Sequence, residues 1–395
     1  MGASTRAGRN ANVAAFMTFA AFLGLGFALP FLPLFVEELG VHDPADAAQW
    51  AGVLIGVGPL LAGLLAPFWG GQADRHGYKR VALVALLALG FSQIVASVAQ
   101  NPWHVLVSRI LSGLLGGVGP LGLAMASGGA PAGGGVSRAI GKIQAAQILA
   151  AGFGPLLGGV FAAALGIRMA FWAAALCCFA AALIVGWFYE DEPRASPSGI
   201  ETPPPIDVPL PAPFFMGLVG TVFFVNFASR SFTPILPAQL EALGLDRRAL
   251  ALSTGMLISV YSIAAAASSF TFGRLASRFD PVRLLGVSLM LSLGTALAMG
   301  YAPTFPIFLA IAAGFGLVSG GSLTLGYSLG SRRYGEAARG AFFGKLSGAA
   351  LIGGAVAPAI AAFVARSALV NVYWMNALIY AALIAVVFLA LRDKR

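Results

Sequence analysis

The sequence predicts an all-α membrane protein with twelve transmembrane helices, arranged as two pseudo-symmetric six-helix bundles. Three observations support this fold class: the composition, twelve apolar stretches of spanning length, and an internal repeat. The 395 residues are 58% hydrophobic and 10% charged, with a mean hydropathy of +0.86. Soluble domains carry about 25% charged residues, so this composition is typical of a protein that folds in lipid.

Each predicted helix corresponds to a stretch of about 20 mainly apolar residues, which is the length needed to cross a bilayer. Short connections that contain Gly, Pro and charged residues separate the stretches. The first six are residues 12–36, 51–69, 81–99, 103–127, 143–165 and 169–188. The second six are residues 214–238, 250–272, 282–301, 304–329, 343–365 and 369–391.

The basic residues predict the orientation, because Lys and Arg near the ends of spans favour the cytoplasmic side. With the N-terminus inside, 18 of the 24 basic residues lie on the cytoplasmic side. The other six are Arg168, Arg247, Arg248 and Arg366 on the opposite side and Arg109 and Arg230 within spans. We therefore expect both termini to be cytoplasmic. The basic residues are too scattered for a nucleic-acid-binding surface.

A polar, proline-rich segment, residues 191–213, divides the chain after the sixth span. Its composition favours an extended, solvated chain over a folded element. We expect it to be a cytoplasmic linker between an N-terminal six-helix bundle, residues 1–190, and a C-terminal six-helix bundle, residues 214–395.

The two halves align when the sequence is offset by 203 or 204 residues. Chance similarity of apolar helices would not keep one register so long. Two parallel repeats joined by a linker are typical of transporters that bind their substrate between the halves, near the membrane midplane. Matched pairs are Pro33 and Pro237, Glu37 and Glu241, Gly70 and Gly273, Arg75 and Arg278, Gly113 and Gly316, and Pro155 and Pro358.

The segment GGQADRHGYKR after the second span is a candidate gate or latch. Its glycines would permit a tight reversal of the chain, and Asp74 could meet a helix N-terminus or an arginine of the other half. The alternative is a solvated basic turn, which would explain Lys79 and Arg80 but not the glycine spacing. The latch candidates are Gly70, Asp74, Arg75, Gly77, Lys79 and Arg80.

The fifth span contains GFGPLLGG, which predicts a conformational joint at Gly154, Pro155, Gly158 and Gly159. The proline removes one helix hydrogen bond, and the glycines permit a bend and a close approach of a neighbouring helix. The alternative is simple glycine-mediated packing, since the chain contains 51 glycines.

Two arginines within spans are candidate substrate or coupling residues, because a charge at membrane depth is costly and usually functional. Arg109 and Arg230 could form an anion site, with Arg109 approaching from the other half and the fork of each guanidinium binding a carboxylate or phosphate. The alternative is that either side chain extends to the surface. Further polar candidates are Asn226, Ser229, Ser231, Gln144, Gln147 and Tyr327.

Several of these motifs resemble the major facilitator superfamily, in particular its drug:proton antiporter branch of multidrug exporters. The resemblance is carried by LPFLPLFVEELGV, APFWGGQADRHG, SRILSGLLGG and the joint GFGPLLGG. It implies the major facilitator fold and a secondary active transporter that works by alternating access in the bacterial inner membrane. It also implies proton-coupled efflux of small amphiphilic compounds or drugs.

The residues themselves leave the substrate and the coupling ion open. The alternatives are export or flipping of an anionic lipid or a phosphorylated or carboxylated metabolite, and uptake by symport. All 15 acidic residues lie outside the span interiors, so proton coupling would have to use Asp74, Glu37, Glu38 or His104, or another ion replaces the proton.

We expect no enzymatic activity, because the spans contain no catalytic constellation. No nucleotide P-loop and no metal-ligand spacing occurs, so we expect neither cofactor nor metal. The expected partners are a small-molecule substrate, a coupling ion and the lipid bilayer, with no nucleic acid, and we expect a monomer.

Overall fold

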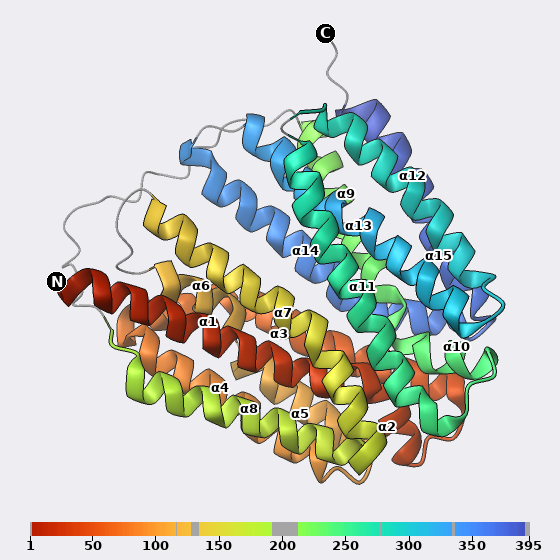
Figure 1. Ribbon diagram of the computed structural model, residues 1–395, viewed down its shortest axis with the longest axis horizontal. Coiled ribbons are helices and arrows are strands. Elements are labelled where there is room, and N and C mark those ends of the chain that lie inside the picture. The colour runs from red at the N-terminus through yellow and green to blue at the C-terminus, as the bar shows by residue number, and fades with distance from the viewer. Residues whose placement is uncertain are drawn as a thin grey trace. The chain divides into compact units, whose positions relative to one another are not determined.

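The computed structural model of the protein describes residues 2–115, 117–127, 134–191, 212–276, 278–333 and 336–391. Every regular element in these ranges is a helix (Figure 1), which confirms the predicted all-α class. Within the same ranges, eleven helices are long and apolar enough to cross a membrane. Most of the predicted linker, residues 192–211, lies outside the described part.

The chain divides into two compact units. Unit 1 contains residues 1–194 together with 246–259, and unit 2 contains residues 195–245 and 260–395. Helix α11 (Arg247–Leu275) therefore begins in unit 1 and ends in unit 2.

Unit 1 is built on α1, which packs along both α7 and α8, while α4 packs on α8 and α5, and α3 packs on α5. Its buried side chains are largely alanine, leucine, valine and phenylalanine. Its helices are α1 (Gly2–Ala28), η1 (Leu29–Phe31), α2 (Leu32–Glu38), α3 (Pro44–His76), α4 (Tyr78–Ser97), α5 (Pro102–Leu115), α6 (Val118–Ser127), α7 (Gly134–Leu165) and α8 (Ile167–Phe188).

Unit 2 repeats this plan: α9 packs along α14, and α12 packs along α13 and α15. Its helices are α9 (Ala212–Ser231), η2 (Thr233–Ile235), α10 (Leu236–Ala242), α12 (Pro281–Gly300), α13 (Phe305–Arg333), α14 (Glu336–Ala365), α15 (Val370–Val386) and η3 (Val387–Leu391), with the later part of α11.

The first helix of each repeat is interrupted in the same way, although the sequence predicts one continuous span in each case. In unit 1 a 3-10 turn separates α1 from α2 at Pro30 and Pro33, and in unit 2 a similar turn separates α9 from α10 at Pro234 and Pro237. Proline lacks the N–H that a continuous helix would use. The shared interruption supports the internal repeat.

The predicted fourth span, residues 103–127, is not one helix. It is divided into α5, which ends at Leu115, and α6, which begins at Val118. Pro120 contributes to the division, because it lacks the N–H that a continuous helix would use there, although Pro59, Pro67 and Pro155 lie inside the unbroken helices α3 and α7. In the first turn of α6 the missing N–H costs nothing, since those donors have no partner within the helix.

Candidate functional site

The segment GGQADRHGYKR lies mainly inside helices and not in a loop, and the predicted tight reversal is confined to one glycine. Helix α3 continues to His76 and α4 begins at Tyr78, so the turn consists of Gly77 alone. Gly77 has a φ of +95°, in the left-handed region that favours glycine. The other latch candidates lie on the ends of these two helices: Gly70, Asp74 and Arg75 on α3, and Lys79 and Arg80 on α4.

Asp191 binds the N-terminus of α4. Its Oδ1 accepts a hydrogen bond from the backbone N–H of Lys79 at 3.0 Å. A Cβ at Gly77 would lie 2.5 Å from Asp191 Oδ2, so a glycine is needed beside this carboxylate. An anion is stabilised at a helix N-terminus. Asp74, which the sequence suggested for such a contact, accepts a hydrogen bond from the hydroxyl of Tyr78 at 2.7 Å.

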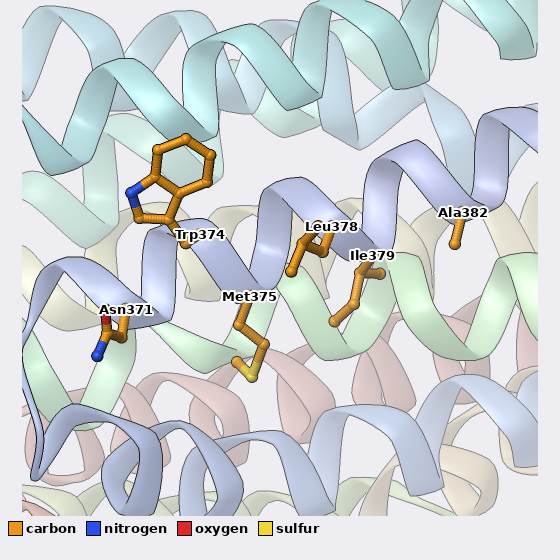
Figure 2. A pocket seen from close by; sticks show the side chains of 6 residues that line it. All are labelled: Asn371, Trp374, Met375, Leu378, Ile379 and Ala382. Atoms are coloured by element: carbon orange, nitrogen blue, oxygen red, sulfur yellow. The ribbon is translucent and has the colours of Figure 1, made fainter.

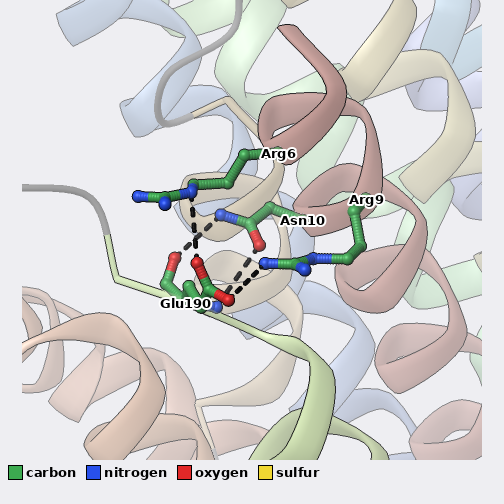
Figure 3. Close-up of polar contacts among 4 residues, drawn as sticks. All are labelled: Arg6, Arg9, Asn10 and Glu190. Carbon is green, nitrogen blue, oxygen red and sulfur yellow. Dashed lines mark hydrogen bonds and ion pairs between the residues drawn. The ribbon is translucent and has the colours of Figure 1, made fainter. Parts of the chain in front are cut away.

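The neighbouring Glu190 holds the N-terminal end of α1 against the end of α8, as Figure 3 shows. Its carboxylate lies 3.1 Å from Arg6 Nε and 2.7 Å from Arg9 Nη2. Its backbone carbonyl accepts from Asn10 Nδ2 at 2.8 Å. The hydrogen bond and the charge of Arg9 lower the pKa of the Glu190 carboxyl. We call these four residues the Glu190 clamp.

Sequence reasoning missed the clamp and the contact of Asp191, because both acids stand at the start of a segment that reads as a linker. The available signal was their position. They directly follow the sixth span, in a segment expected on the same side of the membrane as the basic residues that precede the first and third spans.

Arg109 is buried in unit 1, with 2% of its surface exposed. Its Nη2 donates a hydrogen bond to Oε1 of Gln93 on α4, and its Nε lies 3.4 Å from Oγ of Ser108. Gln93 is itself fully buried. The side chain therefore does not extend to the surface, and a neutral amide stabilises the charge where no acid is available. The sequence reading did not identify Gln93.

The glycines of the predicted joint lie where α7 touches α1. A Cβ at Gly154 would lie 3.1 Å from Cα of Gly26, and a Cβ at Gly158 would lie 2.6 Å from Cα of Phe27. Larger residues at these positions would push the two helices apart. The structure thus shows the glycine-mediated packing that was the alternative interpretation of this motif.

On its other side the joint meets α11. A Cβ at Gly159 would lie 2.9 Å from the carbonyl oxygen of Ala251. The backbone N–H of Leu156, next to Pro155, donates to Oγ of Ser259 at 2.9 Å. The proline segment of α7 is thus bound by a side chain from a helix that continues into unit 2.

Arg230 of unit 2 differs from Arg109, since its side chain is exposed and forms no hydrogen bond or ion pair with any described residue. It passes beside Gly354 of α14, where its Cγ would lie 3.4 Å from an added Cβ. Asn226 and Ser229 are half-buried and donate to carbonyls of their own helix, at 3.1 and 2.8 Å. Ser231 is fully buried.

The remaining polar candidates occupy different positions. Gln144 is exposed and Gln147 is half-buried on α7, with Nε2 of Gln147 close to Gly119 of α6. Tyr327 lies on α13, and its side chain is outside the described part.

An ion pair that the sequence did not predict joins Glu37, at the end of α2, to Arg247, at the start of α11. The two charged atoms are 2.5 Å apart. The Glu37 side chain is 16% exposed and that of Arg247 is 72% exposed. The two residues are 210 positions apart in the sequence, so this contact ties the beginning of the chain to its second half.

The chain matches the family model described as Major Facilitator Superfamily over residues 14–246 and 218–395. It is similar to the multidrug resistance protein MdtG of Yersinia enterocolitica, with 33% identity over 295 residues that make up 73% of this chain and 69% of that protein. The protein of the same name from Proteus mirabilis is 32% identical over 72% of each chain.

Two solved structures share the fold. A bacterial homolog of the human lysosomal transporter Spinster superposes with a TM-score of 0.79 at 16% identity, over 97% of this chain and 96% of that chain. The human organic anion transporter MFSD10 gives a TM-score of 0.68 at 20% identity, over 96% and 99%.

Proposed function

The chain belongs to the major facilitator superfamily, and on that basis we propose that it exports small amphiphilic compounds across the bacterial inner membrane in exchange for protons. It is a multi-pass membrane transporter and not an enzyme. The resemblance to multidrug exporters in its motifs is confirmed. The names of these relatives support drugs as the substrates of this chain.

The observation that carries the proposal is the arrangement of α7 between α1 and α11. Glycines on one face of α7 meet α1, and glycine and proline on another face meet α11, which continues into unit 2. Such close contacts have few alternative packings. A shift of α7 would therefore move α1 and α11 from one packing to another and would not be absorbed by small local adjustments. We expect this element to connect the bundles of residues 1–190 and 214–395 during alternating access.

We assign the coupling proton to Glu37. Among the acidic residues whose side-chain exposure the structure describes, only Glu37 and Asp46 are not exposed, and Asp46 lies in the first turn of α3 beside its N-cap. Glu37 holds Arg247 through its negative charge. Protonation would remove that charge and weaken the contact between α2 and α11.

Transport into inverted membrane vesicles under an imposed pH gradient tests the proposal, with anionic, neutral and cationic compounds as substrates. An acidic lumen should drive accumulation, and a protonophore should abolish it. In the Glu37→Gln variant, accumulation should no longer depend on the gradient, whereas Glu241→Gln, at the exposed residue that matches Glu37 in the second repeat, should behave as wild type. Gradient-dependent accumulation in Glu37→Gln would remove Glu37 from the mechanism.

The second candidate function is export or flipping of an anionic amphiphile, and Arg230 favours it. Its exposed guanidinium has no partner among the described residues, and guanidinium binds carboxylate or phosphate through two parallel hydrogen bonds. The same vesicle assay separates the two functions by the charge of the compounds that accumulate.

The proposed topology places both termini and the linker in the cytoplasm. Single cysteines at Ser198 and Asp43, in a background without Cys177 and Cys178, should react with an impermeant reagent from opposite sides of the membrane. Reaction of both on intact cells would refute this orientation.

A further inference from the structure

Helix α15 carries three buried polar residues on one face: Tyr373, Asn376 and Tyr380, each 0% exposed. Their spacing of three and four residues places them in one row along the helix. Away from this row, the half-buried Met375 and Ile379 and the exposed Leu378 line a shallow apolar pocket (Figure 2). We call the buried row the Asn376 stripe.

The polar atoms of the stripe are incompletely paired. Asn376 Nδ2 donates to Ser231 Oγ of α9 at 2.7 Å, and the Ser231 hydroxyl donates to the carbonyl of Ala228 at 2.8 Å. Asn376 Oδ1 and the Tyr373 hydroxyl have no hydrogen-bond partner among the described residues, and the Tyr380 hydroxyl lies beside the hydroxyls of Ser229 and Ser292 without a hydrogen bond of good geometry to either. Buried polar atoms without partners are unfavourable, and native proteins rarely keep several side by side.

The repeat shows that the fold does not need these polar atoms. At an offset of 202 residues, one less than in the preceding helices, Phe171 and Trp172 of α8 align with Tyr373 and Trp374 of α15. In this register, Phe171, Ala174 and Cys178 occupy the stripe positions, and each of them is also 0% exposed. Unit 1 thus fills the same buried row with two apolar side chains and a thiol. Unit 2 adds an oxygen at all three positions.

The surroundings define the ligand. Phe232 stacks on the Tyr373 ring at 5.4 Å between centroids, and Phe315 packs edge-on against the Tyr380 ring at 6.2 Å. No charged side chain belongs to the stripe. The unpaired atoms comprise one acceptor and two hydroxyls that both donate and accept. A small neutral ligand with the same double capacity, such as water, matches these atoms.

We propose that the Asn376 stripe binds a row of internal water molecules between α15 and α9, and that transport requires them. Successive stripe residues are about 4.5 and 6 Å apart along the helix axis, so the three polar side chains follow one another along a single face. Polar groups that cost stability without serving the fold are expected at functional positions. The row contacts α9 at Ser231, the residue that follows Arg230. The water site depends on neither the substrate class nor the coupling ion proposed above.

Hydroxyl-radical footprinting of the wild-type protein tests the site directly, because radicals formed from a bound water react with the side chains beside it. Tyr373 and Tyr380 should be labelled roughly tenfold faster than the equally buried ring of Phe171, which serves as the internal control. Equal labelling of all three rings would overturn the proposal. This measurement needs no transport substrate, so its failure is distinct from failure of the proposed function.

A triple variant tests whether transport requires the bound water. Tyr373→Phe, Asn376→Leu and Tyr380→Phe keep the shapes and remove the polar atoms, so the variant should unfold at or above the wild-type temperature. Its transport rate should fall by at least about tenfold. Leu378→Ala, on the exposed face of the same helix, should keep the wild-type rate. Wild-type transport by the triple variant, or a fall in its unfolding temperature, would overturn the proposal.

Discussion

The fourth membrane segments of the two repeats differ, although they occupy equivalent positions. In unit 1 the segment is divided into α5 and α6, whereas α13 of unit 2 runs unbroken from Phe305 to Arg333. At an offset of 203 residues, Pro120 of α6 aligns with Leu323 of α13. The unit 1 segment therefore lacks an N–H that the leucine supplies in unit 2.

A second difference accompanies the first. Trp69 of α3 donates its indole N–H to the carbonyl of Leu114, near the end of α5, at 2.7 Å. The residue aligned with Trp69 in unit 2 is Phe272, which has no donor. The tryptophan thus occurs in the repeat where a helix end exposes carbonyls. The proline and the tryptophan thus both occur in the repeat whose fourth segment is divided.

The intramembrane arginines show the same contrast. Arg109 is buried and bonded to Gln93, whereas Arg230 is exposed and has no bond to a described residue. One charge is part of the packing of its unit, and the other is exposed. The predictions below test whether this contrast holds.

The largest effect is expected for Gln93→Leu. The change leaves the buried guanidinium of Arg109 without its amide acceptor, which costs about 3 kcal/mol or more of unfolding free energy. The thermal unfolding midpoint in detergent and the yield of monodisperse protein measure it. Gln93→Glu retains an acceptor and should restore both. A Gln93→Leu protein as stable as wild type would show that Arg109 does not depend on this contact.

Arg230→Ala should act on transport and not on stability. Transport of an anionic substrate should fall at least about tenfold, which corresponds to roughly 1.4 kcal/mol, while the unfolding midpoint stays near that of wild type, as for most exposed positions. Arg230→Lys should be only partly active, because an ammonium lacks the planar fork. Uptake of neutral substrates is the control. Unchanged anion transport in both variants would remove the anion site.

The broken helix can be converted toward its counterpart. Trp69→Phe removes one hydrogen bond and should cost about 1 kcal/mol. In a Pro120→Leu background, where the helix can continue as in α13, the same change should cost clearly less. Unfolding midpoints of the two single variants and the double variant form a cycle that measures this coupling. Purely additive effects would mean that Trp69 does not serve the break.

The smallest effect concerns the Glu190 clamp of unit 1. Arg9 lowers the pKa of the Glu190 carboxyl from its ordinary value of 4.5. The ionised carboxylate therefore stabilises the clamp at pH values above 4.5, and this contribution is lost as the pH falls through the lowered pKa. Glu190→Gln should therefore lower the unfolding midpoint at neutral pH and lose that difference in acid. A difference that persists in acid would assign the effect to packing.

Much of the architecture could be predicted from the sequence, because membrane helices must satisfy their own backbone and be apolar over a fixed length. The predicted spans follow from that rule, and within the described residues eleven helices satisfy it; the repeat was recognised instead from matched residues such as Pro155 and Pro358. The glycines of α7 were also recognisable, since close helix contact in lipid depends on small residues. The division of α5 from α6 was missed because Pro120 lies within an uninterrupted apolar run.

The sequence by itself determined that this chain is a two-repeat membrane protein with a glycine- and proline-rich α7 and two arginines within its spans. Only the tertiary structure decided which polar groups meet. Gln93 reaches Arg109 across two helices, Glu37 reaches Arg247 over 210 positions, and Asn376 reaches Ser231 over 145. The physical reason is that hydrophobic length is a local property of the chain, whereas a hydrogen bond depends on the rotation of two packed helices about their axes.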